Sequence, residues 1–187
     1  MKIALFYYDG FAEFEIVLVG LLFHHEHDII SIALENREYR SEECQRFRVD
    51  KVVTDVDVDS IDLLVIPGGN SSPLVGNQEL KRFIEKLVSR NRKVGGICGG
   101  SGLLAGLGML EGKRCTGGAS GVKPGDDEYK YYSGAMLSDE YVVVDGNIIT
   151  AQGQAYAEFA VELACQMGVV KDKEEYDECL RWCKNIR

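Results

Sequence analysis

The sequence predicts an α/β fold in which helices cover both faces of a mostly parallel sheet. Short apolar runs alternate with segments of helical apolar spacing along the 187 residues. Turn sequences such as Pro67-Gly68-Gly69 end the apolar runs, and no linker, repeat or low-complexity stretch interrupts the alternation. Strands that alternate with helices are typical of parallel sheets. We therefore expect residues 1–187 to form a single domain.

The pattern of apolar and polar residues predicts the bounds of each element. Apolar runs predict strands over residues 2–7, 28–34, 63–66, 94–97, 114–116, 141–144 and 148–151. Apolar spacings of three and four predict helices over residues 11–23, 77–90, 101–107, 155–167 and 173–183. Residues 36–53 are expected to form a hairpin arm and residues 117–140 mostly a loop. Asp145-Gly146-Asn147 is a type I′ turn signal between two strands.

The pentapeptide Gly96-Ile97-Cys98-Gly99-Gly100 is the strongest functional signal. It lies between an apolar run and a helical pattern, which predicts a nucleophile elbow with one cysteine at its tip. Glycines suit this turn because it is too tight for a Cβ atom. The N–H of Gly99 and the helix start are expected to lower the pKa of the Cys98 thiol. The alternative is a structural cysteine in a glycine-rich packing turn.

Loops at the carboxyl ends of parallel strands meet at one edge of the sheet, so three loops are expected to converge on Cys98. Pro67-Gly68-Gly69 is either an ordinary turn or an oxyanion-hole loop whose N–H groups face the thiol. Glu13 and Glu15 lie two residues apart, so at most one of them faces the crevice from a helix. A carboxyl held protonated there would hydrogen-bond the thiolate. The residues alone leave the choice between the two acids open.

Histidine is absent from the chain after Cys98. His24, His25 and His27 are the only three, and all follow the first predicted helix. A Cys-His dyad in the usual chain order is therefore excluded within one chain. The cluster is better explained as a polar helix end than as a catalytic or metal site.

Composition excludes several classes of partner. The net charge of −9 argues against nucleic acid and against an anionic membrane surface. No segment approaches the roughly 18 apolar residues of a membrane-spanning helix. The six cysteines show neither a C-x-x-C pair nor zinc spacing, and we expect reduced thiols in a cytoplasmic protein.

Two sequence patterns resemble cofactor sites but do not fit them. The run of alternating aspartates at residues 55–59 lacks the glycine and the final glutamate of a calcium loop. Gly100-Ser101-Gly102-Leu103-Leu104-Ala105 fits G-x-G-x-x-A but lies late in the sheet, with a cysteine at the turn where a pyrophosphate would approach. We therefore predict neither a metal nor a cofactor.

Four segments together resemble the ThiJ/PfpI family of the class I glutamine-amidotransferase-like superfamily, over nearly the whole chain. They are Asp9-Gly10-Phe11-Ala12-Glu13-Phe14-Glu15, Leu64-Val65-Ile66-Pro67-Gly68-Gly69, the elbow, and Ile148-Ile149-Thr150-Ala151-Gln152-Gly153 with Glu158-Phe159-Ala160.

The resemblance implies a flavodoxin-like three-layer sandwich that forms a homodimer and needs no cofactor. It places the nucleophile at Cys98, the acidic partner at Glu15 and the oxyanion-hole amides at Gly68, Gly69 and Gly99. Many members also carry a histidine after the strand that follows the elbow helix, and here Gly118 occupies that position. General-base assistance of about 10²- to 10⁴-fold is thereby lost.

Three functions compete. The first is a cysteine-dependent enzyme, an amidase or hydrolase or a deglycase or glyoxalase-like enzyme, that acts on a small carbonyl or amide compound through Cys98. The second is a redox or stress-response protein whose low-pKa thiol is oxidised by peroxide. The third is a small-molecule binding module that keeps the fold without the chemistry.

Overall fold

The computed structural model describes residues 1–185 and contains a seven-stranded sheet in the order β10-β11-β7-β6-β1-β2-β5. All neighbouring strands are parallel except the β10–β11 hairpin at one edge. The bounds are β1 Lys2–Phe6, β2 Asp28–Ala33, β5 Lys51–Val52, β6 Leu63–Ile66, β7 Lys93–Ile97, β10 Val142–Asp145 and β11 Ile148–Ala151. The predicted α/β class is confirmed.

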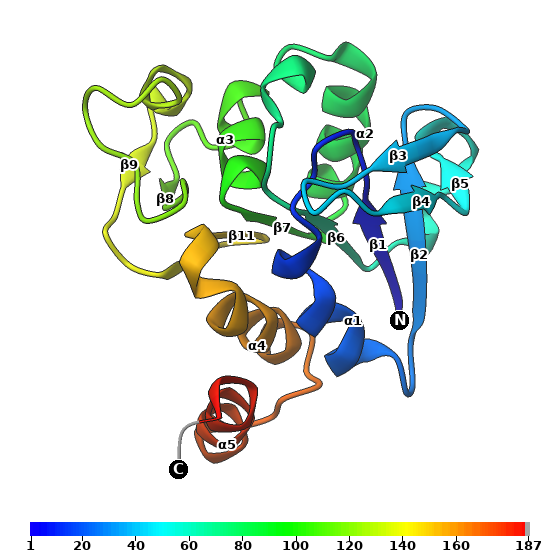
Figure 1. The fold of residues 1–187 in the computed structure, drawn as a ribbon. Coiled ribbons are helices and arrows are strands. Elements are labelled where there is room, and N and C mark those ends of the chain that lie inside the picture. The colour runs from blue at the N-terminus through cyan, green and yellow to red at the C-terminus, as the bar shows by residue number, and fades with distance from the viewer. Residues whose placement is uncertain (186–187) are drawn as a thin grey trace.

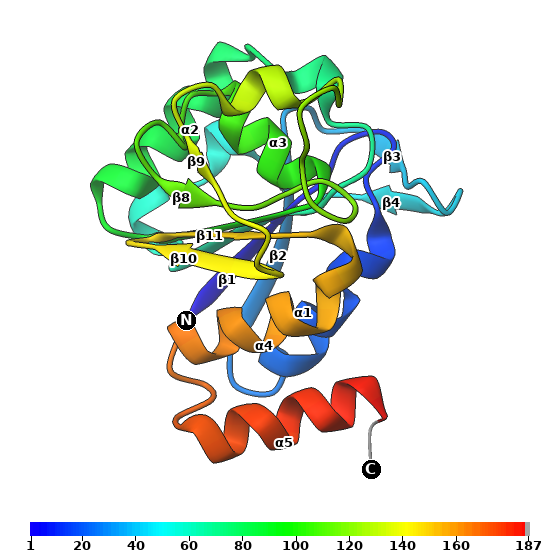
Figure 2. The ribbon, with the colours of Figure 1, turned by 90° about the vertical axis from the view of Figure 1, so that its left-hand side faces the viewer.

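Helices form a layer on each face of this sheet (Figures 1 and 2). One face carries α2 (Gln78–Ser89) and α3 (Gly99–Gly106), and the other carries α1 (Val17–Phe23) and α4 (Tyr156–Gln166). The last helix, α5 (Lys173–Lys184), packs on α4 outside these layers and has no buried residue. Among residues 1–185, no helix has the length and apolar character needed to cross a membrane.

Local sequence explains the central elements well. All four residues of β6 are buried, as expected for a strand covered on both faces. The helix α2 begins at Asn77, whose side chain accepts a hydrogen bond of 2.9 Å from the N–H of Leu80. In β7, a Cβ on Gly95 would lie 2.9 Å from Leu163 of α4. The glycine therefore lets α4 pack directly on the strand.

The predicted helix over residues 11–23 is wrong in its first half. Residues 13–15 form a single 3₁₀ turn, and α1 begins only at Val17. The preceding backbone instead pairs with the loop after β6: the N–H of Ala12 donates to the carbonyl of Gly68 over 2.9 Å, and the N–H of Asn70 donates to Gly10 over 2.9 Å. These long-range bonds hold residues 10–12 beside that loop.

The two irregular regions are more ordered than predicted. The arm contains the expected hairpin, formed by β3 (Glu38–Arg40) and β4 (Arg46–Arg48), while β5 joins the edge of the main sheet. The segment after α3 contains β8 (Arg114–Cys115) and β9 (Met136–Leu137), which pair with each other outside the main sheet, and a 3₁₀ turn at residues 129–132. The β10–β11 turn has a positive φ, 64°, only at Gly146, so it is not the predicted type I′ turn.

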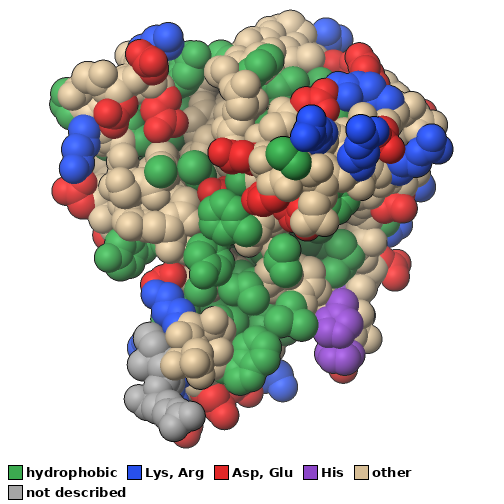
Figure 3. Space-filling view, in the orientation of Figure 1, with side chains coloured by type: hydrophobic (Ala, Val, Ile, Leu, Met, Phe, Trp, Pro, Cys, Tyr) green, Lys and Arg blue, Asp and Glu red, His purple; other side chains and the backbone are tan. Residues whose placement is uncertain are grey.

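An exposed apolar face, formed by Phe14, Val17, Leu21, Tyr156 and Trp182, extends over α1, α4 and α5 (Figure 3). These side chains are between 39% and 63% exposed. The rings of Phe14 and Tyr156 meet edge to face, with centroids 5.6 Å apart, so the face is continuous between the 3₁₀ turn before α1 and the start of α4. Apolar clusters of this kind mark interaction surfaces more often than single exposed residues do.

Candidate active site

Cys98 lies at the tip of a strained turn between β7 and α3. Its backbone has φ 53° and ψ −124°, a conformation that is costly for a residue with a Cβ. The following residues can turn this tightly because they are small: a Cβ on Gly100 would collide with the carbonyl oxygens of Ile66 and Pro67. The backbone geometry is therefore that of the predicted elbow, and it presents the thiol at the carboxyl edge of the sheet.

Two backbone amides face the sulfur of Cys98. The N–H groups of Gly99 and Gly69 both hydrogen-bond it, and both favour its ionised form. Gly69 has φ 93°, and a Cβ there would collide with the carbonyl of Gly10, so the loop requires glycine at this position. The hydroxyl of Ser71 donates to the carbonyl of Gly99 over 2.7 Å and ties the loop to the elbow helix.

The structure distinguishes the two candidate acids. Glu15 is 2% exposed and hydrogen-bonds the Cys98 thiol. The Glu13 carboxylate instead accepts a hydrogen bond of 3.3 Å from the hydroxyl of Ser41 in the arm. The 3₁₀ turn that replaces the start of the predicted helix is what directs Glu15 inward.

Glu15 and Cys98 compete for one proton. Burial raises the pKa of Glu15 to about 7. Burial, and then repulsion from an ionised Glu15, raise the pKa of Cys98 to about 12, against the opposing effect of the two amides. The expected lowering of the thiol pKa by the helix start is therefore outweighed. The thiolate is favoured when Glu15 carries the proton, because the site disfavours two negative charges.

Gly68, predicted for the oxyanion hole, has both of its backbone polar groups bonded within the protein. Its N–H donates to Glu15 Oε2 over 2.6 Å and is therefore not free to face an oxyanion. Its carbonyl accepts hydrogen bonds from Ala12 and, over 2.5 Å, from the hydroxyl of Tyr8. Tyr8, the second residue after β1, was not predicted from the sequence, and its hydroxyl ties the loop after β6 to the end of β1.

Gly153 forms a wall of the site that the sequence analysis also missed. A Cβ on this residue would lie 2.9 Å from Glu15 Oε1 and 3.0 Å from Cys98 Sγ. Its N–H donates to the carbonyl of Gly118 over 2.9 Å. The segment after β11 therefore closes the site behind the acid–thiol pair.

Two cavities lie at this edge of the sheet. The larger, about 280 Å³, is lined by Tyr7, Tyr39 and Arg37 among others, but by neither Cys98 nor Glu15. The smaller, about 140 Å³, is not lined by Cys98 or Glu15 either, but it is lined by Gly69 and Gly99, whose amides bind the sulfur. Of these two cavities, the smaller is therefore the one that adjoins the residues bonded to the Cys98 thiol.

The three histidines lie far from Cys98. The segment of residues 24–27 joins α1 to the start of β2, at the edge of the sheet opposite Cys98. Gly118 has φ 65°, which a histidine would adopt only with strain. Within residues 1–185, no group of three or more His, Cys, Asp or Glu side chains is placed to hold a metal ion. All six cysteines are free thiols.

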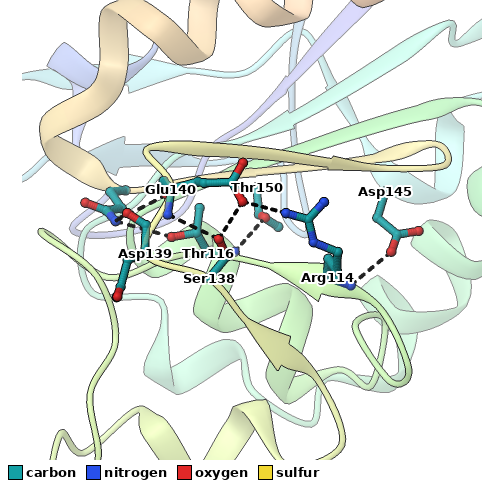
Figure 4. A network of polar contacts seen from close by, with 8 residues as sticks. Arg114, Thr116, Ser138, Asp139, Glu140, Asp145 and Thr150 are labelled. Atoms are coloured by element: carbon teal, nitrogen blue, oxygen red, sulfur yellow. Dashed lines mark hydrogen bonds and ion pairs between the residues drawn. The ribbon is translucent and has the colours of Figure 1, made fainter.

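A polar network fixes both ends of the segment that contains Gly118 (Figure 4). At its start, the N–H of Thr116 donates to Thr150 of β11 over 3.0 Å. At its end, Glu140 pairs with Arg114 at 2.5 Å and accepts from Ser138 at 2.8 Å. The segment is thereby anchored on β8 and β11 beside the elbow.

Comparison with known proteins places this geometry in a family. A model described as the DJ-1/PfpI family matches residues 1–166. The chain is 29% identical to Deglycase TK1284 of Thermococcus kodakarensis over 161 residues, which are 84% of this chain and 94% of that protein. It is 27% identical to Deglycase PYRAB04690 of Pyrococcus abyssi over 161 residues, with the same two shares, 84% and 94%.

Solved structures agree with the sequence comparison. The DJ-1 superfamily protein Atu0886 from Agrobacterium tumefaciens matches all of both chains, with a TM-score of 0.84 and 26% identity. Drosophila melanogaster DJ-1beta has the same fold, with a TM-score of 0.81, 20% identity and coverage of 98% and 97% of the two chains. The predicted flavodoxin-like sandwich is confirmed, and the chain belongs to the DJ-1/PfpI family.

Proposed function

We propose that this protein is a cysteine-dependent enzyme that acts on a small carbonyl or amide compound through Cys98. One observation carries the proposal: a strained elbow presents a thiol to a buried carboxyl on one side and two backbone amides on the other. A carboxyl that shares a proton with a thiol supplies a nucleophile, and convergent amides stabilise the oxyanion that its attack creates.

The proposed reaction begins with transfer of the Cys98 proton to Glu15. Because the pKa of Glu15 is about 7, this carboxyl exchanges protons near neutral pH without a histidine. The thiolate then attacks the carbonyl carbon. As the sulfur loses its charge, the N–H groups of Gly69 and Gly99 leave it and bind the resulting oxyanion. Gly68 holds Glu15 through its N–H, so we assign it a positioning role in place of an oxyanion contact.

The cavity size favours a small substrate. The cavity beside Gly69 and Gly99 has a volume of about 140 Å³. This size favours a small compound over a folded peptide segment. Two relatives are named deglycases, which suggests a glycated compound as the substrate.

The alternatives account less well for the site. A peroxide sensor depends on a low-pKa, accessible thiol, whereas burial and Glu15 raise the pKa of Cys98. A simple binding module would not require a strained φ of 53° at a cysteine, since a glycine there would cost less. The redox reading predicts that mild peroxide adds oxygen to Cys98 before the other five cysteines, which intact-mass and peptide analysis can measure.

We propose that the exposed apolar face mediates a homodimer. Phe14 is adjacent in sequence to Glu15, and Tyr156 follows the segment that contains Gly153, so a second copy seated there would border the active site. Val17→Glu and Leu21→Glu are expected to yield monomers in light scattering. Dimers that persist in both variants would contradict this.

The free thiols agree with a location in a reducing compartment, and we propose the cytoplasm.

Turnover by variants tests the proposed enzyme. A panel of small α-oxoaldehydes and primary amides is incubated with the wild type, with Cys98→Ala and with Cys44→Ala. The last variant is the control, because it removes an exposed cysteine from another part of the chain. Activity should fall to background only in Cys98→Ala. Equal activity in both variants on every compound turned over would refute the proposal.

A further inference from the structure

Two glycines leave a gap beside the elbow, and side chains from one loop fill it. Gly117 and Gly118 directly follow β8 and Thr116. A Cβ on Gly118 would lie 2.8 Å from Glu128 Oε1, and a Cβ on Gly117 would collide with the hydroxyl of Tyr132. Glu128 and Tyr132 therefore occupy the space that side chains at positions 117 and 118 would otherwise take.

Glu128 also reaches the elbow helix and the smaller cavity. Its Oε2 is 2.9 Å from the place of a Cβ on Gly102 of α3. The cavity that it lines is bounded by Gly69 and Gly99. A compound bound there would lie against Glu128 and against Gly69 and Gly99, the two residues whose N–H groups bond Cys98.

The hydroxyl of Tyr132 is a second polar group in the space beside Gly102 and Glu128. Tyr132 is 3% exposed, and its hydroxyl has no hydrogen-bond partner among residues 1–185. That oxygen is 3.8 Å from the same Cβ position on Gly102 that Glu128 approaches. A buried hydroxyl without a partner is costly, and this one lies beside Glu128 in the space next to the elbow helix.

We infer that Glu128 is the second proton-transfer residue of the Cys98 site and protonates the oxyanion of a small aldehyde or ketone bound in this cavity. This inference rests on the proposed function. In it, the carboxyl of Glu128 takes the role of the histidine that this chain lacks. Burial and the neighbouring Asp126 raise the pKa of Glu128, which favours the protonated form that a donor requires.

The step balances without any further reactant. The thiol proton of Cys98 moves to the Glu15 carboxylate, and the sulfur lone pair forms a C–S bond with the carbonyl carbon. The π electrons move to oxygen, which the Gly69 and Gly99 amides stabilise. The proton of Glu128 then moves to this oxygen and leaves a hemithioacetal and an ionised Glu128. The reverse transfers release the aldehyde.

Two reactions of Cys98 separate the role of Glu128 from that of the thiolate. Alkylation by iodoacetamide needs the thiolate but creates no oxyanion, whereas addition to methylglyoxal, a small α-oxoaldehyde, creates one. Both rates are measured for the wild type, Glu128→Gln and Asp127→Asn, with Cys98→Ala as the baseline. Asp127 is exposed in the same loop, so its variant controls for the change in charge.

We expect Glu128→Gln to slow aldehyde addition about 10²- to 10⁴-fold, the usual worth of a positioned acid, while alkylation changes less than about twofold. Asp127→Asn should change neither rate. Equal losses in both reactions, or no loss in either, would overturn the inference. A wild type whose Cys98 is alkylated but adds no aldehyde would instead refute the proposed carbonyl chemistry, and this inference with it.

Discussion

Replacing Glu15 by Gln tests whether the buried carboxyl and the Cys98 thiol share one proton. The substitution keeps the shape of the side chain, and the Gln oxygen can still accept from the Gly68 N–H, which lies 2.6 Å from Oε2 in the wild type. It removes the charge and the titration. In the wild type, the pair should lose its protons in two steps, one near the pKa of about 7 of Glu15 and one near the pKa of about 12 of Cys98.

The size of the effect follows from the charge removed. Two unit charges ~4 Å apart repel by about 4 kcal/mol at an effective dielectric constant of ~20, which corresponds to ~3 pKa units. Burial is the larger cause of the raised Cys98 pKa, and it remains in the variant. We therefore expect the Cys98 pKa to fall by ~1–3 units in Glu15→Gln.

The assay is the pH dependence of Cys98 alkylation, measured on the isolated peptide by mass spectrometry. The wild type should show a small rise near pH 7 and a second rise only at high pH. Glu15→Gln should show one rise, at a pH between these two steps. Glu13→Gln, the matched change in the neighbouring acid, should retain the wild-type profile. A step near pH 7 that persists in Glu15→Gln would refute the shared proton.

Three further predictions concern stability and packing. The pKa of Glu15 is about 7 in the folded protein and lower in the unfolded chain, so the wild type should lose about 3 kcal/mol of unfolding free energy between pH ~4.3 and ~7. Denaturant unfolding of Glu15→Gln should lack this loss. An equal loss in both proteins would contradict the raised pKa of Glu15. Gly153→Ala places a methyl group 3.0 Å from Cys98 Sγ and should slow Cys98 alkylation at least ~10-fold with unchanged circular dichroism, whereas an unchanged rate would contradict this wall. Gly95→Ala drives a methyl group to 2.9 Å from Leu163 and should lower the unfolding free energy by about 1–3 kcal/mol, which a stable variant in urea titrations would disprove.

The sequence predicted features that neighbouring residues determine. The buried strand β6, the capped helix α2 and the elbow around Cys98 all depend on patterns within a few residues, and all are present. The choice between Glu13 and Glu15 depends instead on a hydrogen bond to Gly68, 53 residues away along the chain. Local apolar spacing contains no information about such a bond, so the helix predicted from it began too close to the N-terminus.

The walls of the site were missed for the same reason. Gly153 lies in a segment that carries the family resemblance but no chemically reactive side chain, and Glu128 lies in a predicted loop; only the fold brings both beside the elbow. At Gly118 the sequence showed that a side chain is absent. It could not show that Glu128 fills the space left there. Glycines near a predicted nucleophile are the signal that can identify such positions in advance.

Direct observation of the bond between Cys98 and a substrate carbon tests the account most closely. ¹³C-labelled methylglyoxal is mixed with the wild type and with Cys98→Ala, and NMR follows the labelled aldehyde carbon. Attack by Cys98 should give a protein-bound tetrahedral carbon in the wild type that is absent in Cys98→Ala. The same signal in both proteins, or none in the wild type, would contradict the assignment of Cys98 as the nucleophile.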